Sequence, residues 1–117
     1  MAFGEALIKK TSVQHEIARS RCDIEQCRLL TLQAAEVMDR EGLDGARPYI
    51  SMIKIVAPRM AQEVADRAMQ IYGGMGVCQD TMIPDVFTVG RFCRIADGPD
   101  EVHMSQLGKM TVRSLAN

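Results

Sequence analysis

Apolar residues recur every three or four positions between Pro48 and Tyr72, and this pattern constrains the fold more than any other feature. The spacing aligns apolar side chains along one side of an α-helix, whereas a half-buried strand would alternate with a period of two. The pattern stays in phase across Pro58, so we expect one kinked helix there and not two helices. The repeating positions are Ile50, Ile53, Ala57, Met60, Val64, Ala68 and Ile71.

Three other segments also show helical spacing, and no segment reads as a strand. The first of them carries an apolar stripe broad enough to touch more than one neighbour. Gly42 and Gly45 interrupt the pattern after it and predict a loop over Glu41–Ala46. We place the four helices at about 13–40, 48–72, 84–95 and 99–115. The expected fold is therefore all-α, an antiparallel up-and-down four-helix bundle.

Composition restricts the kind of protein this is. A chain of 117 residues suggests one domain, residues 1–117, and nine Met with no Trp favour an adaptable helical core. The net charge of −1 shows no excess of basic residues of the kind that binds nucleic acid. No apolar run approaches a transmembrane segment in length, and the first residues do not form a signal peptide. The four Cys form no C-x-x-C pair, so we expect free thiols and no metal site.

The segment before the last helix combines a helix start with a carboxylate that the helix does not need. Pro99 suits the first helical position, with Gly98 as the N-cap. Asp100 and Glu101 would then lie in the first turn, where Glu101 could reach back to the cap as in a capping box. Asp97 falls before the cap. It is either a turn residue whose side chain bonds a nearby backbone N–H, or a base held beside a ligand, and the spacing leaves both open.

A glycine-rich segment follows the second long helix. Gly73, Gly74 and Gly76 match neither a P-loop nor G-x-G-x-x-G, and they follow a helix where those motifs follow a strand, which excludes a Rossmann site. Glycine here is either a helix cap and turn, or a place where the backbone approaches a phosphate closely because no Cβ intervenes. Gln70, one turn earlier, is either a solvated residue or a polar contact to the same ligand.

Together these segments resemble the C-terminal helical domain of the acyl-CoA dehydrogenases, over nearly the whole chain from Phe3 onward. The most similar subgroup is that of family members ten and eleven. The resemblance is carried by Ala2–Gly4, Met52–Lys54, Ala57–Pro58, Gln70–Val77 and Arg94–His103. It implies a flavoenzyme of fatty-acid β-oxidation, in which a carboxylate removes the α-proton of an acyl-CoA thioester while the β-hydride passes to FAD.

The resemblance also implies roles for single residues. Asp97 matches the position of the catalytic base, where most of the family has Glu, and its backbone N–H would share the thioester oxygen with a flavin hydroxyl. The cofactor-binding positions that it implies are Phe3, Gln70, Gly73, Gly74, Pro99 and Glu101. Gln70 to Gly74 match the segment that touches the adenosine diphosphate of FAD in a neighbouring subunit. Phe3 matches the Phe of an Arg-x-x-Phe-Gly motif whose Arg would precede Met1.

Two of these positions depart from the family pattern, because Pro99 and Glu101 stand where Thr and Gln are commoner. The family forms homodimers or homotetramers and passes electrons to electron-transfer flavoprotein or another acceptor, in the mitochondrial matrix or alternatively the peroxisome. Its members also carry an N-terminal helical domain and a middle β domain. Since this chain has neither, we expect it to be inactive alone. The alternative is a helical oligomerisation module with no chemistry.

Overall fold

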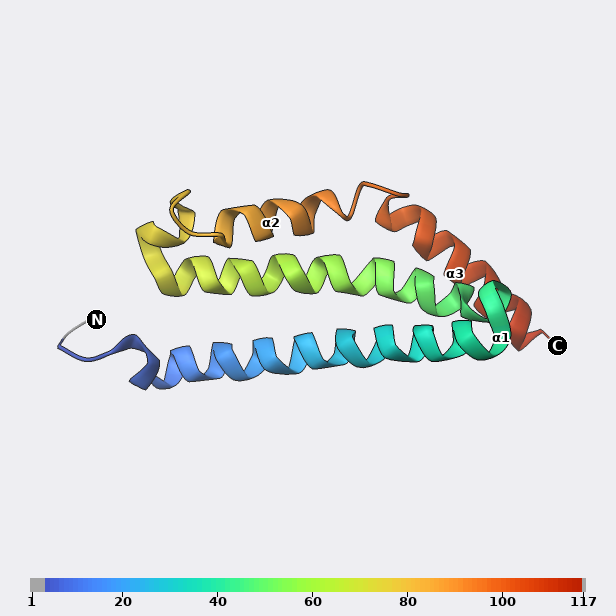
Figure 1. Ribbon diagram of the computed structural model, residues 1–117, viewed down its shortest axis with the longest axis horizontal. Coiled ribbons are helices and arrows are strands. Elements are labelled where there is room, and N and C mark those ends of the chain that lie inside the picture. The colour runs from blue at the N-terminus through green and yellow to red at the C-terminus, as the bar shows by residue number, and fades with distance from the viewer. Residues whose placement is uncertain (1–3, 117) are drawn as a thin grey trace.

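A computed structural model describes residues 4–116, and every regular element in that range is helical (Figure 1). The elements are the short 3₁₀ helices η1 (Leu7–Lys9) and η2 (Gly73–Val77), and the α-helices α1 (Thr11–Tyr72), α2 (Ile83–Phe92) and α3 (Asp100–Leu115). The all-α prediction is confirmed.

The long helix α1 is a hairpin of two antiparallel arms, residues 11–41 and residues 43–72 (Figure 1). They meet at Gly42, whose φ of 73° and ψ of −170° make it the one non-helical residue inside α1. Glycine adopts this backbone conformation without a Cβ clash. The predicted loop over Glu41–Ala46 was therefore too long, because one Gly reverses the chain. Gly45 is helical and lies close to Glu41, where an added Cβ would come within 2.6 Å of the Glu41 Cβ.

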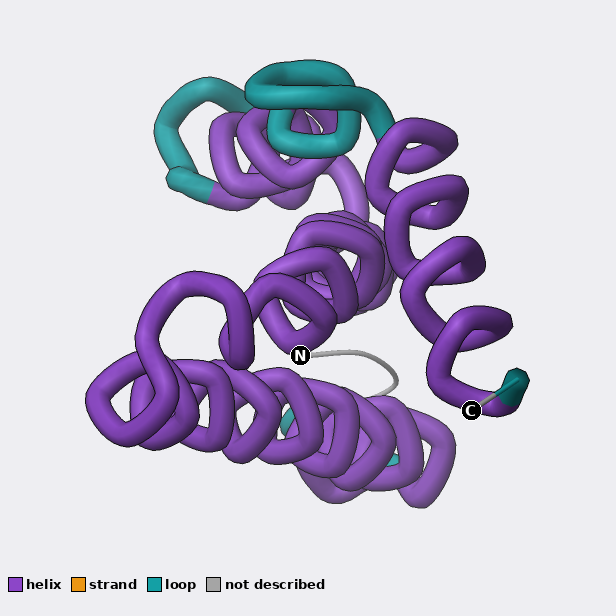
Figure 2. Tube along the Cα trace, turned by 90° about the vertical axis from the view of Figure 1, so that its right-hand side faces the viewer, coloured by secondary structure: helices purple, strands orange, loops and turns teal. Residues whose placement is uncertain are grey.

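The second arm begins earlier than predicted, so Pro48 lies beyond its first turn. The arm continues through Pro58 with helical backbone angles, which confirms that one helix and not two runs through it, while the kink at Pro58 stays a prediction. Seen end-on, this arm is the central element, with the first arm on one side and α2 and α3 on others (Figure 2). Helices α2 and α3 both pack on α1 and not on each other. Residues 4–116 therefore contain three α-helices, of which α1 is a hairpin of two arms, so the predicted count of four separate helices is not exact.

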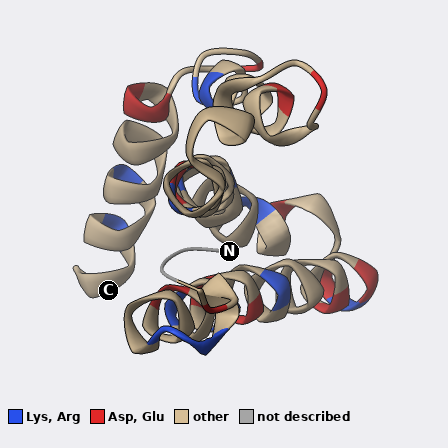
Figure 3. Ribbon diagram, turned by 90° about the vertical axis from the view of Figure 1, so that its left-hand side faces the viewer, with Lys and Arg blue, Asp and Glu red and all other residues tan. Residues whose placement is uncertain are grey.

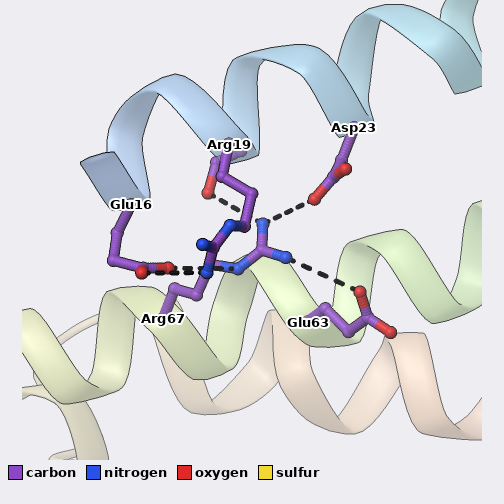
Figure 4. Close-up of polar contacts among 6 residues, drawn as sticks. Glu16, Arg19, Asp23, Glu63 and Arg67 are labelled. Carbon is purple, nitrogen blue, oxygen red and sulfur yellow. Dashed lines mark hydrogen bonds and ion pairs between the residues drawn. The ribbon is translucent and has the colours of Figure 1, made fainter. Parts of the chain in front are cut away.

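Two contacts hold α2 and the first arm against the second arm. Gly90 of α2 lies against it, and a Cβ there would come within 3.0 Å of the Gln62 backbone N. Arg67 joins the two arms of α1 through a cluster of polar contacts (Figure 4). Its guanidinium bonds Asp23 at 2.6 Å and lies 3.5 Å from Glu16, and its side chain is only 18% exposed. Since Glu16 and Asp23 lie on the first arm, while a third partner, Glu63, lies on the second, Arg67 ties the two arms together and fixes the register of the hairpin.

The core is thin for a chain of this length. The radius of gyration is 17.8 Å and the extents are 62 × 25 × 25 Å, whereas a compact domain of this length would have a radius of gyration of about 13 Å. The buried apolar residues are all small or medium in size: Cys27, Ala34, Val37, Ala46 and Ala65. The chain by itself therefore leaves much apolar surface in water.

The first arm shows this most clearly. Its predicted stripe is buried only in part, because Ile17 and Ile24 remain 48% and 41% exposed. Leu29 and Leu32, on the same arm, are more than half exposed. These side chains suit contact with another protein surface. None of the described helices combines the length and apolar character needed to cross a bilayer.

Candidate active site

Asp97 lies in the connection between α2 and α3 and belongs to neither helix. Its φ is 54°, the only positive φ among the described non-glycine residues, and Gly98 follows with φ 93°. Two successive residues of positive φ turn the chain sharply away from the helix that precedes them. The prediction that Asp97 stands outside the last helix is confirmed, and the residue is exposed.

The helix start differs from the prediction by one residue. Pro99 is the N-cap, with ψ 163°, and Asp100 is the first helical residue. The predicted cap at Gly98 was wrong, because the fixed φ of Pro99 (−67°) is as compatible with a cap as with a first turn. The shift moves Glu101 to the second helical position. No side chain bonds the cap, so the predicted capping box is absent.

The acidic first turn was predicted correctly. Asp100 and Glu101 begin α3 and Arg113 lies in its last turn, an arrangement of charges that Figure 3 shows along the helix and that complements the helix dipole. Asp100 is only 4% exposed. Its Oδ2 accepts a hydrogen bond of 2.9 Å from Arg94 Nε and longer ones of 3.4 Å from Arg59.

These contacts change the acidity of Asp100. Burial acts most strongly and raises its pKa. The hydrogen bond and charge of Arg94, followed by those of Arg59, together outweigh burial, so the pKa of Asp100 lies below its ordinary value. Asp100 is therefore a structural carboxylate, held ionised by two arginines, and not a proton-transferring group.

The carboxylate of Asp97 is in a different situation. It forms no hydrogen bond or ion pair with any other residue in the range 4–116. The turn interpretation, which needs a bond from this side chain to a backbone N–H, has no support here. The backbone N–H of Asp97 is likewise not donated to any acceptor in that range. Both groups that a base and an oxyanion donor would use are therefore available.

The connection carrying Asp97 is held by side chains from α1 and α3. Lys54 Nζ donates to the carbonyl oxygens of Cys93 (2.8 Å) and Ala96 (2.7 Å). His103 Nε2 lies 3.1 Å from the Asp97 carbonyl oxygen. Hydrogen bonds therefore hold the carbonyl groups on both sides of the Asp97 N–H, while the carboxylate of Asp97 stays unpaired.

The glycine-rich segment forms the far end of the second arm. Gly73 caps α1 with φ 62° and ψ −135°, and its N–H bonds Met69 O, so Gly73 ends the helix as the cap interpretation expects, although its ψ lies outside the left-handed helical region. At Gly74 nothing lies within 4 Å of the place a Cβ would occupy. At Gly76 a Cβ would come within 2.5 Å of Met69 O. Gly76 is therefore required by packing, whereas Gly74 faces open space.

The structure separates the expected site residues into two groups. The end of α1 and the helix η2, which carry the exposed residues Gln70, Gly73 and Gly74, lie at one end of α2 (Figure 1). Asp97 follows the other end of α2, in the connection to α3. Helix α2 has ten residues, which corresponds to about 15 Å. Pro99 and Glu101 are exposed beside Asp97 at the start of α3. Phe3 lies outside the described residues.

Sequence reasoning missed the residues that hold the Asp97 connection. Lys54 is the one charged residue in the apolar run from Met52 to Ala57, and that isolation was a usable signal. No signal in the sequence indicated the pairing of Arg94 with Asp100, because that contact depends on how the connection between α2 and α3 turns.

Comparisons with known proteins show which family has this architecture. The family model of the acyl-CoA dehydrogenase C-terminal domain matches residues 1–111. Acyl-CoA dehydrogenase family member 11 of Rattus norvegicus is 47% identical over 115 residues, which cover 98% of this chain and 15% of that protein. Family member 10 of Mus musculus is 45% identical over 113 residues, covering 97% and 11%.

A solved structure described as an acyl-CoA dehydrogenase from Mycobacterium abscessus superposes with a TM-score of 0.94 at 40% identity, covering 98% of this chain and 28% of that one. The predicted similarity to members ten and eleven is confirmed. The chain spans between 11% and 28% of the length of each of these relatives. On the family match and on these identities, it belongs to the acyl-CoA dehydrogenase family and corresponds to the C-terminal domain of its members.

Proposed function

We propose that this chain is the catalytic-base and assembly domain of a flavin-dependent acyl-CoA dehydrogenase. The reaction is α,β-dehydrogenation of an acyl-CoA thioester, as in fatty-acid β-oxidation. One observation carries the proposal: an exposed, unpaired carboxylate stands outside the helices at Asp97, on a backbone with positive φ and beside its own unused N–H.

In this proposal Asp97 acts twice. Its carboxylate takes the proton from the carbon α to the thioester carbonyl. As that proton leaves, negative charge moves onto the thioester oxygen. The backbone N–H of Asp97 donates a hydrogen bond to this oxygen, where a donor fixed in advance lowers the barrier. FAD, when bound, accepts the hydride from the β-carbon.

The residues present fit FAD in two separate places. Gln70, Gly73 and Gly74 are exposed, and the open space at Gly74 lets a phosphate approach the backbone. Pro99 and Glu101 are exposed next to Asp97. Since α2 separates the two groups by about 15 Å, we assign the first to the nucleotide held by a neighbouring copy and the second to the nucleotide beside Asp97. Phe3, which lies outside the described residues, is proposed as a further cofactor-binding residue because it matches the Phe of the Arg-x-x-Phe-Gly motif.

The proposal also implies further domains, an oligomer and an electron acceptor for the complete enzyme. A flavin site and a thioester site need an N-terminal helical domain and a middle β domain beside this one, so the chain alone should not catalyse. The exposed apolar residues of the first arm would form the centre of a homodimer or homotetramer. Electron-transfer flavoprotein or another acceptor would reoxidise the cofactor, in the mitochondrial matrix or alternatively in the peroxisome.

The test is made on the complete flavoenzyme with this chain as its C-terminal domain. Asp97→Asn keeps the size and the backbone N–H but removes the base, so FAD content and acyl-CoA binding should survive. Flavin reduction by acyl-CoA, followed by stopped flow, should slow by about 10²-fold or more. Asp97→Glu should keep partial activity, because a displacement of about 1 Å costs around 10²-fold. Bleaching of the Asn variant at the wild-type rate would remove Asp97 from the reaction.

The alternative is a helical oligomerisation module with no chemistry, and the exposed apolar side chains of the first arm suit it equally well. Flavin absorbance separates the two. After the chain is combined with the two missing domains, retained FAD supports the dehydrogenase. A stable oligomer without flavin supports the module.

A further inference from the structure

Lys54 holds the peptide group that carries the Asp97 N–H. The residue sits in the middle of the second arm, half-buried, and no carboxylate pairs with its ammonium among residues 4–116. Its Nζ instead donates to two carbonyl oxygens, those of Cys93 at 2.8 Å and Ala96 at 2.7 Å. A half-buried cation whose hydrogen bonds go only to carbonyl groups costs desolvation. The helix alone does not require it.

The Ala96 carbonyl and the Asp97 N–H belong to one peptide group. No described peptide bond is cis, and in a trans peptide the C=O and the N–H point in opposite directions. Since the Ala96 oxygen points at Lys54, the Asp97 N–H points away from the second arm. That N–H has no acceptor within the described chain. Lys54 therefore fixes the direction of an unused donor.

The charge of Lys54 adds a second effect. A hydrogen bond from an ammonium to a carbonyl oxygen is stronger than a neutral one and polarises the whole amide. The N–H at the other end of the same peptide becomes a stronger donor. His103 contacts the Asp97 carbonyl, which belongs to the next peptide. Among residues 4–116, Lys54 is the one residue that hydrogen-bonds the peptide group carrying the free N–H.

We propose that Lys54 is a positioning residue for the oxyanion donor. It aims the Asp97 N–H at the thioester oxygen and strengthens that N–H as charge develops. The inference rests on the proposed function of Asp97, and it adds a residue that touches neither substrate nor cofactor.

The experiment uses the complete flavoenzyme carrying Lys54→Met, which keeps the apolar stem and removes the ammonium. Lys54→Gln is the second variant, because its amide can replace one hydrogen bond without the charge. Lys109→Met is the matched control, since Lys109 is exposed on α3 and forms no polar contact in the described chain. All three should retain FAD. Flavin reduction should slow by about 10- to 100-fold in Lys54→Met, less in Lys54→Gln and not in the control.

A second measurement does not depend on turnover. A β-ketoacyl-CoA has an acidic α-proton, so the pKa of this ligand on the enzyme reports how well the oxyanion is stabilised. We expect its enolate absorbance to titrate about one pKa unit or more higher in Lys54→Met, which corresponds to a tenfold weaker stabilisation, with Lys54→Gln between. A residue that only supported folding would lower FAD content or stability and leave this ligand pKa unchanged.

The outcomes separate the two proposals. If Asp97→Asn slows flavin reduction while Lys54→Met and Lys54→Gln leave both the rate and the ligand pKa at wild-type values, the Lys54 inference fails alone. If Asp97→Asn reduces flavin normally, the proposed function fails. Should Lys54→Met lose FAD, the ligand pKa in Lys54→Gln decides: a raised value supports the inference, and a wild-type value overturns it.

Discussion

Replacing Asp100 by Asn tests whether an ion pair holds the start of α3. Asp100 is 4% exposed and receives one well-formed hydrogen bond, from Arg94 at 2.9 Å. Breaking a fully buried ion pair costs about 3–5 kcal/mol. The Arg94 side chain is 28% exposed and regains some water, and Arg59 is 47% exposed with contacts of 3.4 Å. We therefore expect Asp100→Asn to lower the free energy of unfolding by about 2–3 kcal/mol at neutral pH.

The effect should depend on pH with a definite sign. Because the pKa of Asp100 in the folded chain lies below its ordinary value of 3.8, the ionised carboxylate stabilises the fold at pH values above that ordinary value. The stabilisation declines as the pH falls through the folded pKa. The difference between wild type and Asp100→Asn should be constant above about pH 5 and should shrink below about pH 4.

Urea denaturation of this chain at one fixed protein concentration, repeated from pH 3 to pH 8, measures the difference directly. Asp44→Asn is the control, because Asp44 also faces an arginine, Arg47, at 3.2 Å but is 93% exposed. Exposed pairs of that kind contribute little. Equal stability of the Asp100 and Asp44 variants at pH 7 would refute the reasoning, as would a difference that grows towards acid pH.

Two further predictions concern the apolar surface and the glycine segment. The isolated chain should self-associate through the exposed side chains of its first arm, and a clean monomer at tens of micromolar in sedimentation would count against this. Gly74→Val should leave the fold intact but weaken FAD binding in the complete enzyme, measured by retained flavin, whereas Gly76→Val should destabilise the chain because its Cβ would meet Met69 O at 2.5 Å.

The sequence predicted burial well where the apolar face of a helix packs against other parts of the same chain. The second arm is packed on several sides, and its repeating apolar positions from Ile50 to Ile71 are at least half-buried. The first arm has the same periodicity, yet Ile17 and Ile24 remain exposed. Periodicity shows which face of a helix seeks a partner but not whether that partner lies in the same chain.

Connections were harder to predict, because their geometry depends on single backbone angles. The loop around Gly42 was predicted too long since two glycines looked alike, although only Gly42 has a positive φ and Gly45 is helical. The cap of α3 was displaced by one residue for a similar reason, because proline suits both positions. Asp97 was correctly placed outside the helix, but its positive φ and the Lys54 contacts depend on tertiary packing.

The positive φ of Asp97 also bears on which acid stands there. Among residues with a side chain, Asp and Asn adopt this backbone region most readily, because a short polar group bonds or hydrates locally. Gly98 also has a positive φ, so two successive residues of the connection lie in this backbone region. A Glu at this position would adopt the same φ at greater strain. If Asp97 is the base, its short side chain therefore suits a backbone of positive φ, and Lys54 and His103 hold that backbone through the carbonyl oxygens of Cys93, Ala96 and Asp97.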